Sequence, residues 1–261
     1  MPSGGDTIIA PMGTMQELDT TTTERAARID LAAAFRLAVR MDLHEGVCNH
    51  FSLMLPDAKR FFLNRYGLHW GEVTASNLLA LDAGGNVLEG EGEFEKTAFY
   101  IHSRIHLAHP RAACVLHTHM PYATAFTLLE HGRLEMVEQN ALRFHDDIAY
   151  DDTYNGLVVD TREGDRLASV LGAKRVLFLA NHGVVVVGPT VAEAFDLMYY
   201  LERACRLQVL ARSMGGRLRP VRPEVVHETH RMLLADATQY AGAHFSALKR
   251  ILDREEPDYS R

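Results

Sequence analysis

Apolar residues recur along this chain in two patterns, one typical of amphipathic helices and the other of short buried strands. Spacings of three or four predict helices over residues 24–43, 95–109 (ended by Pro110), 121–131, 162–171, 190–210 and 223–252, with a short helical turn over 74–81. Short apolar runs predict strands over 51–55, 60–63, 115–119, 175–180 and 184–187, with a loop or hairpin at 82–86 and an irregular stretch over 134–156.

The order of these elements indicates an α/β fold. Strands alternate with helices, and the strands at 175–180 and 184–187 are joined only by the short turn Asn181-His182-Gly183. Both observations favour a mixed sheet that is covered by helices on its two faces.

The 261 residues contain no linker, repeat or low-complexity break. We therefore expect a single domain over residues 24–252, preceded by a flexible lead-in at 1–23 and followed by a tail at 253–261. The lead-in lacks the basic and apolar regions of a signal peptide, and no run of about 18 apolar residues indicates a membrane span.

Charge and cysteine content narrow the function classes. The net charge of -7 is dispersed, which indicates neither a nucleic-acid partner nor a membrane surface and favours small molecules and copies of the same chain. Cys48, Cys114 and Cys205 are an odd number without metal-ligand spacing, so free thiols in the cytoplasm are expected.

The pattern His117-Thr118-His119 stands at the end of an apolar run. Side chains two residues apart on a strand point the same way, so the two imidazoles can converge on one point. His182 follows another apolar run, and a third imidazole from a neighbouring strand end would complete a set of nitrogen ligands. Three neutral imidazoles leave coordination positions open, as in catalytic metal sites. The alternative is three histidines that are hydrogen-bonded within the core.

Several motifs, in this order, resemble the class II aldolase/adducin family. They are Asn49-His50-Phe51-Ser52, Tyr66-Gly67-Leu68, Thr74-Ala75-Ser76, Ile101-His102-Ser103-x-Ile105-His106, His109-Pro110, Leu116-His117-Thr118-His119, Gln139-Asn140-Ala141-Leu142-Arg143-Phe144 and Asn181-His182-Gly183. The resemblance implies a three-layer α/β/α sandwich with a largely antiparallel central sheet, and a homotetramer with active sites at subunit contacts. It also implies one divalent metal ion per chain, held by His117, His119 and His182.

Such an ion is a Lewis acid that grips two adjacent substrate oxygens and stabilises the enolate formed when a bond to carbon breaks. Aldol cleavage, epimerisation, decarboxylation and dehydration share this intermediate. Zinc is the expected ion, although three imidazoles also bind manganese or iron.

The acid/base residue of the family's sugar-phosphate aldolases is not at its usual place. Their glutamate lies nineteen residues before the first histidine of the pair, where this chain has Ala98. Glu95 can take the role only if the helix starts differently or the register slips. Tyr122, Glu138 and a metal-bound water are the alternatives.

The phosphate pocket of those aldolases also differs. Tyr66 stands before Gly67 in place of a short hydroxyl residue, Lys96 and Thr97 replace two serines, and His50 stands where asparagine is common. A phenol and a long ammonium would crowd a phosphate but suit a carboxylate or an aromatic ring. We expect a non-phosphorylated acid as substrate, bound by Asn49, His50, Ser52, Tyr66, Gly67, Lys96 and Thr97.

Three functions compete. The first is a metal-dependent lyase, a decarboxylase or aldol-type enzyme, acting on a small hydroxy-, keto- or aromatic acid. The second is a non-haem iron oxygenase that couples oxygen chemistry to decarboxylation. The third is a non-catalytic adducin-like scaffold, which should have lost the ligand histidines and carry a long basic tail.

Other histidines have simpler interpretations. His102 and His106 share one helix face, and we expect them to pack the helix or to support the metal ligands from behind. His227 and His230 are expected on the surface of the last helix.

Overall fold

The computed structural model describes residues 14–109 and 111–261. Residues 1–13 of the predicted lead-in, and Pro110 as the predicted helix stop, lie outside the described residues.

The described strands form one mixed sheet in the order β4-β3-β2-β1-β5-β8-β7-β6. Every neighbouring pair is antiparallel except β6 with β7, which is parallel. The strands are β1 (His50–Met54), β2 (Arg60–Leu63), β3 (Leu79–Asp82), β4 (Val87–Glu89), β5 (Cys114–Thr118), β6 (Ile148–Asp151), β7 (Val176–Leu179) and β8 (Gly183–Gly188). The predicted mixed, largely antiparallel sheet is confirmed.

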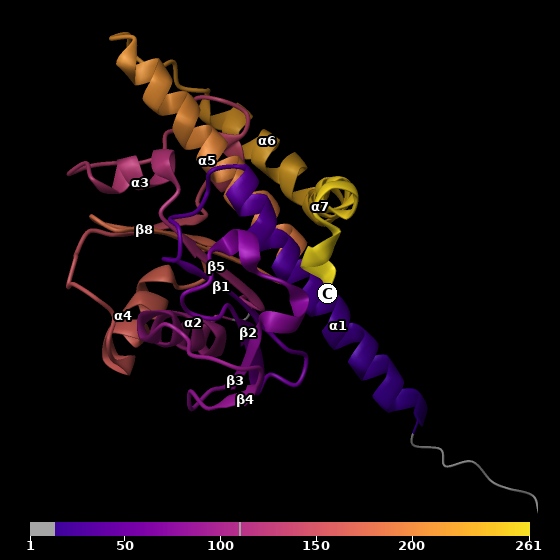
Figure 1. The fold of residues 1–261 in the computed structure, drawn as a ribbon. Coiled ribbons are helices and arrows are strands. Elements are labelled where there is room, and N and C mark those ends of the chain that lie inside the picture. The colour runs from indigo at the N-terminus through magenta and orange to yellow at the C-terminus, as the bar shows by residue number, and fades with distance from the viewer. Residues whose placement is uncertain (1–13, 110) are drawn as a thin grey trace, which may run out of the picture.

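Helices cover both faces of this sheet, which confirms the α/β/α layers (Figure 1). They are α1 (Thr14–Arg40), α2 (Lys96–Ala108), α3 (Pro121–Thr127), α4 (Thr161–Leu171), α5 (Val191–Ser213), α6 (Pro223–Ala235) and α7 (Ala237–Glu255). Helices α1 and α5 bury their apolar sides on one face, and α2 and α4 bury theirs on the other. None of the helices in the described part of the chain is long and apolar enough to cross a membrane.

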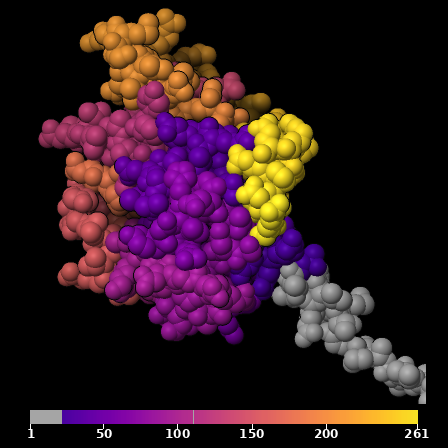
Figure 2. All heavy atoms as spheres, in the orientation of Figure 1, coloured from indigo at the N-terminus to yellow at the C-terminus, as the bar shows by residue number. Residues whose placement is uncertain are grey.

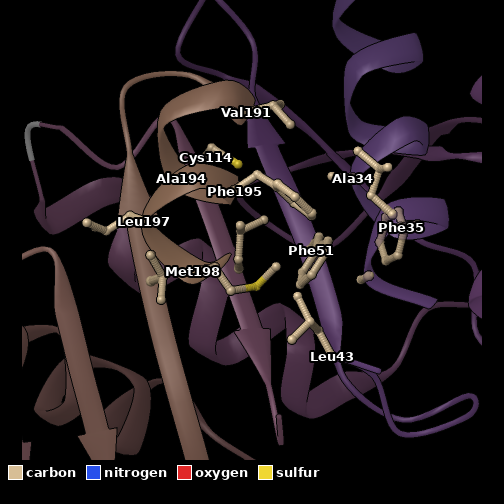
Figure 3. Close-up of a cluster of buried hydrophobic side chains, with 14 of the residues drawn as sticks. Ala34, Phe35, Leu43, Phe51, Cys114, Val191, Ala194, Phe195, Leu197 and Met198 are labelled. Atoms are coloured by element: carbon tan, nitrogen blue, oxygen red, sulfur yellow. The ribbon is translucent and has the colours of Figure 1, made fainter. Parts of the chain in front are cut away.

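The side chains of alternate residues in the central strands pack into hydrophobic cores on opposite faces of the sheet. Phe51 of β1 and Cys114 of β5 pack with Phe35 of α1 and Phe195 of α5 (Figure 3). Val115 packs on the opposite face, among apolar side chains of α2 and α4. Because side chains alternate along a strand, His50, Ser52 and His117 must also face the α2 layer. The sheet thus presents three polar side chains to one helix.

Four predicted elements were wrong in type or extent. Only Ala75–Asn77 of the predicted helical turn at 74–81 is helical, and β3 begins at Leu79. The stretch 134–156 contains β6, α3 ends at Thr127 rather than residue 131, and the helix at 223–252 is two helices separated at Asp236. The runs that form β3 and β6 are too short for their periodicity to distinguish strand from helix or loop.

Both chain ends are more structured than the predicted lead-in and tail. Helix α1 begins at Thr14, inside the stretch 1–23. Residues 257–260 form a short helix in which Tyr259 is buried, and Glu256 and Asp258 pair with Arg36 of α1. Figure 2 shows these C-terminal residues against the N-terminal helix.

Candidate metal centre

His117, His119 and His182 come together at the end of β5. His117 lies on β5, His119 lies just beyond its last residue, and His182 lies in the turn between β7 and β8. Since β8 pairs with β5, with Val185 opposite His117, the turn brings His182 to the same end of the sheet. One nitrogen of each ring lies within 4.8 Å of the others, and no other group of three histidine, cysteine or acidic residues does so in the described residues.

The outer hydrogen bonds of two rings aim their remaining nitrogens inward. His117 Nδ1 donates to the Val184 carbonyl at 3.0 Å, and His119 Nδ1 is bonded to the Glu45 carboxylate. In its neutral form, a ring that donates from Nδ1 has its lone pair on Nε2. His119 Nε2 is buried and has no hydrogen-bond partner within the described residues. An orphaned nitrogen beside two other imidazoles fits a divalent metal ion, and the partners on Nδ1 are the usual support for such ligands.

Burial also keeps the rings in the form that binds metals. It holds the pKa of His117 well below its usual range, and the neighbouring histidines His182, His50 and His119 add to this effect. Burial and His119 lower the pKa of His182 to about 4, although Glu45 opposes the shift. Both rings are therefore neutral at pH 7, and metal binding requires neutral imidazole.

Asn49 and Gly183 hold His119 in place. Asn49 adopts a positive φ of 72°, and its Oδ1 accepts a hydrogen bond from the His119 backbone N–H at 3.2 Å. Gly183 lies against the ring: a Cβ at this position would be 2.5 Å from His119 Cδ2 and 2.8 Å from the Thr118 carbonyl oxygen. The glycine of the Asn181-His182-Gly183 turn is therefore required by close packing.

A cavity of about 510 Å³ opens over the three histidines. Six predicted substrate or acid/base residues line it together with them: Asn49, His50, Tyr66, Glu95, Lys96 and Thr97. The sequence did not indicate the other lining residues, which are Val47, Cys48, Glu93, Phe94 and Leu157.

Glu95 reaches this cavity because it is the N-cap of α2. Its Oε2 accepts the Ala98 backbone N–H at 2.8 Å and the Thr97 hydroxyl, and it lies 3.8 Å from His50 Nε2. Ala98, at the position counted for the aldolase glutamate, is buried among apolar residues. An acid is thus present at the cavity wall although that position is alanine.

Four other predicted residues do not line the cavity of their own chain. Ser52 is buried behind His50, and Gly67 forms the turn beside Tyr66 with a φ of 83°. The backbone N–H of Tyr122 donates to Glu202, and the Glu138 carboxylate accepts backbone N–H groups of a nearby turn. The roles predicted for Tyr122 and Glu138 are not supported by this placement.

The remaining histidines lie elsewhere. His102 and His106 of α2 lie behind His50 and do not belong to the group of three converging histidines. His227 is exposed, as expected, but His230 is partly buried and its Nδ1 donates to the Leu142 carbonyl at 2.8 Å.

Glu45 is the most informative residue that the sequence did not reveal. It lies in the loop before Asn49, and only the folded path of this loop brings it to His119. Glu45→Gln should lower zinc affinity by about tenfold to a hundredfold, because the ring loses the charge that orients it and raises its basicity. Competition with a zinc-binding dye measures this. Glu93→Gln, which removes a charge from the same cavity without touching the ligands, should bind zinc as the wild type does; equal losses in both variants would refute the role of Glu45.

The comparison with known proteins agrees with this geometry. The family model of the "Class II Aldolase and Adducin N-terminal domain" matches residues 29–209. The chain belongs to the class II aldolase and adducin family. It is 35% identical over 240 residues to a putative aldolase class 2 protein of Caulobacter vibrioides, covering 91% of this chain and 93% of that one.

Two further relatives show the breadth of the family. The crystal structure of an aldolase II superfamily protein from Pseudomonas syringae superposes with a TM-score of 0.85 at 33% identity, covering 91% of this chain and 96% of that one. Human beta-adducin is 31% identical over 249 residues, which are 94% of this chain but 34% of adducin. Family membership therefore supports aldolase-like chemistry as a class. The specific reaction has to be inferred from the residues of the site.

Proposed function

We propose that this protein is a divalent-metal-dependent carbon–carbon lyase, a decarboxylase or aldol-type enzyme, acting on a small non-phosphorylated hydroxy-, keto- or aromatic acid. The observation that carries the proposal is the convergence of three imidazoles, one with an orphaned buried nitrogen, at an open cavity. A scaffold with no chemistry to perform would have no need of this arrangement, which argues against an adducin-like role.

The residues of the cavity have separable tasks. His117, His119 and His182 would hold the metal ion, with zinc expected. When bound, the ion supplies Lewis-acid stabilisation of the negative charge that develops on substrate oxygens. Lys96 is exposed at the cavity wall and forms no ion pair with a carboxylate in the described residues, so its ammonium is available to a substrate carboxylate.

Glu95 is the best-placed group to move a proton. When the carbon–carbon bond breaks, its electron pair stays on the carbon that becomes part of an enolate, and that carbon must then receive a proton. The Glu95 carboxylate is fixed at the cavity wall by two donors of α2 and can hold this proton. Tyr66 stands 54% exposed at the mouth, where its ring can cover an aromatic or apolar part of the substrate.

Assembly and compartment complete the proposal. Leu157 lines the cavity yet is 73% exposed, and Val47, which also lines it, is 41% exposed. Apolar groups at the mouth support a homotetramer whose subunit contacts enclose the site. Cys48, Cys114 and Cys205 are free thiols, which suits the cytoplasm.

The test has two steps. Metal analysis of protein purified with and without air should find about one ion per chain. Hydroxy-, keto- and dihydroxyaromatic acids are then screened for released carbon dioxide and aldehyde, with a sugar phosphate such as fuculose 1-phosphate as the control. Turnover of an acid without oxygen, and none of the sugar phosphate, is expected. A strict need for oxygen would instead establish the iron oxygenase. Protein that contains no metal would refute the proposal that it is a metal-dependent enzyme.

A further inference from the structure

A buried chain of hydrogen bonds runs from the cavity through the α2 layer. His50 Nδ1 lies 2.7 Å from His102 Nε2, and His102 Nδ1 lies 2.5 Å from Ser52 Oγ. Ser52 Oγ lies 2.7 Å from His106 Nε2, and His106 Nδ1 lies 2.6 Å from the Ala112 carbonyl oxygen. His102 and Ser52 are completely buried, and His50 is 4% exposed. Every ring nitrogen and hydroxyl oxygen of this series except His50 Nε2 therefore has a hydrogen-bond partner, and the order of donors and acceptors can be traced.

The Ala112 carbonyl fixes which groups donate and which accept along this series of hydrogen bonds. A carbonyl oxygen only accepts, so His106 must carry its hydrogen on Nδ1, and its Nε2 accepts the Ser52 hydroxyl hydrogen. Ser52 has a single hydrogen, so its oxygen accepts from His102 Nδ1, and His102 Nε2 in turn accepts from His50 Nδ1. The reverse direction would need a doubly protonated His106, which is disfavoured because the ring is partly buried and has no acid partner among the described residues.

This order leaves the lone pair of His50 on Nε2, which is the nitrogen that faces the cavity. Its neighbour there is the Glu95 carboxylate, with His50 Nε2 and Glu95 Oε2 3.8 Å apart. Both groups accept hydrogen bonds, and they are too far apart to share one directly. A carbonyl oxygen placed between them would add a third acceptor. A hydroxyl group, in contrast, would supply the hydrogen that the pair lacks.

We propose that His50 Nε2 and the Glu95 carboxylate form a subsite of two hydrogen-bond acceptors. This subsite selects acids that carry a hydroxyl group in addition to the carboxylate and the oxygen on the adjacent carbon. Ser52, His102 and His106 are positioning residues that hold His50 in the required tautomer. The substrate class is then a di- or polyhydroxy acid. The choice of an acid rests on the proposed function, whereas the tautomer of His50 does not.

The tautomers are measured first. Nitrogen-15 NMR of histidine-labelled protein, with single His→Gln variants for assignment, should find the hydrogen on Nδ1 in His50, His102 and His106. A hydrogen on Nε2 of His50 would overturn the proposal. This measurement needs neither turnover nor bound metal, so it stands even if the proposed function fails.

Selectivity is measured next, by calorimetric titration of the zinc-loaded protein with glycerate and with lactate, which lacks only the second hydroxyl. Glycerate should bind about tenfold more tightly, the value of one good hydrogen bond. Equal affinities would overturn the proposal. If neither acid binds, the proposed acid substrate is contradicted, and the tautomers alone decide the role of His50.

Ser52→Ala breaks the chain at its centre and should reduce the preference for glycerate to about twofold or less, leaving lactate binding unchanged. Ser52→Thr keeps a hydroxyl and should restore the preference. Ser103→Ala is the matched control, since Ser103 Oγ is buried on α2 without a hydrogen-bond partner among the described residues. An unchanged preference in Ser52→Ala would show that the chain does not position His50.

Discussion

Replacing His117 with alanine is expected to leave the protein without bound metal and to reduce turnover of the proposed acid substrate at least a thousandfold. His117 is one of only three nitrogen ligands available at the site in the described residues, and its ring is 2% exposed with Nδ1 fixed by the Val184 carbonyl. Two imidazoles hold a divalent ion weakly, and the several kcal/mol that the ion contributes to the transition state would be lost. Elemental analysis and initial rates measure the two effects.

The control for this variant is His131→Ala, which removes an exposed imidazole outside the cavity. It should retain about one ion per chain and the wild-type rate. Circular dichroism should show the same secondary structure in both variants, because within residues 14–109 and 111–261 the His117 ring is hydrogen-bonded only to the Val184 carbonyl. Full metal content in folded His117→Ala would mean that the metal lies elsewhere, and the proposed function would have to be abandoned.

The convergence of the histidine side chains could be predicted because its geometry is mostly local. His117 and His119 are two residues apart at a strand end, and the alternation of side chains along a strand is enough to bring them together. His182 required knowledge of which strands are neighbours, and this came from the family resemblance. The pairing of β5 with β8 supplies the physical reason.

The contacts that hold these histidines in place could not be predicted, because they depend on segments far apart in the sequence. Glu45 reaches His119 through a loop whose path turns at Asn49, where φ is positive. Ser52 was expected in the substrate site, yet its place on β1 turns it toward His102 and His106 of α2. Which residues of a strand contact which residues of a helix is not encoded in either segment alone.

Glu95 illustrates how counting along a sequence can mislead. A gapless count from His117 selects Ala98, which the structure buries among apolar residues. A carboxylate is instead present at the N-cap, where the Glu95 side chain folds back to accept the backbone N–H of Ala98. Capping fixes the direction of the Glu95 side chain. Its carboxylate therefore reaches the cavity although Glu95 lies three residues before the position selected by the count.

Gly183→Ala is expected to damage both stability and metal binding, although it adds a single methyl group. The new Cβ would lie 2.5 Å from His119 Cδ2 and 2.8 Å from the Thr118 carbonyl oxygen, so either the ligand ring or the backbone of β5 must move. Overpacking of this kind costs about 1–3 kcal/mol of unfolding free energy. Displacement of the ring should lower zinc affinity by about a hundredfold, since ligand orientation alone has effects of this size.

Gly242→Ala separates this contact from the general effect of removing a glycine. Gly242 lies within α7, and no atom outside its own helix turn lies within 4 Å of the place that a new methyl group would take. Alanine there should raise the unfolding free energy by about 1 kcal/mol through helix propensity. Urea unfolding and zinc competition on the two variants measure both quantities. If Gly183→Ala bound zinc as tightly as the wild type, His119 could not be a ligand in the position described, because the ring and the new methyl group cannot occupy the same space.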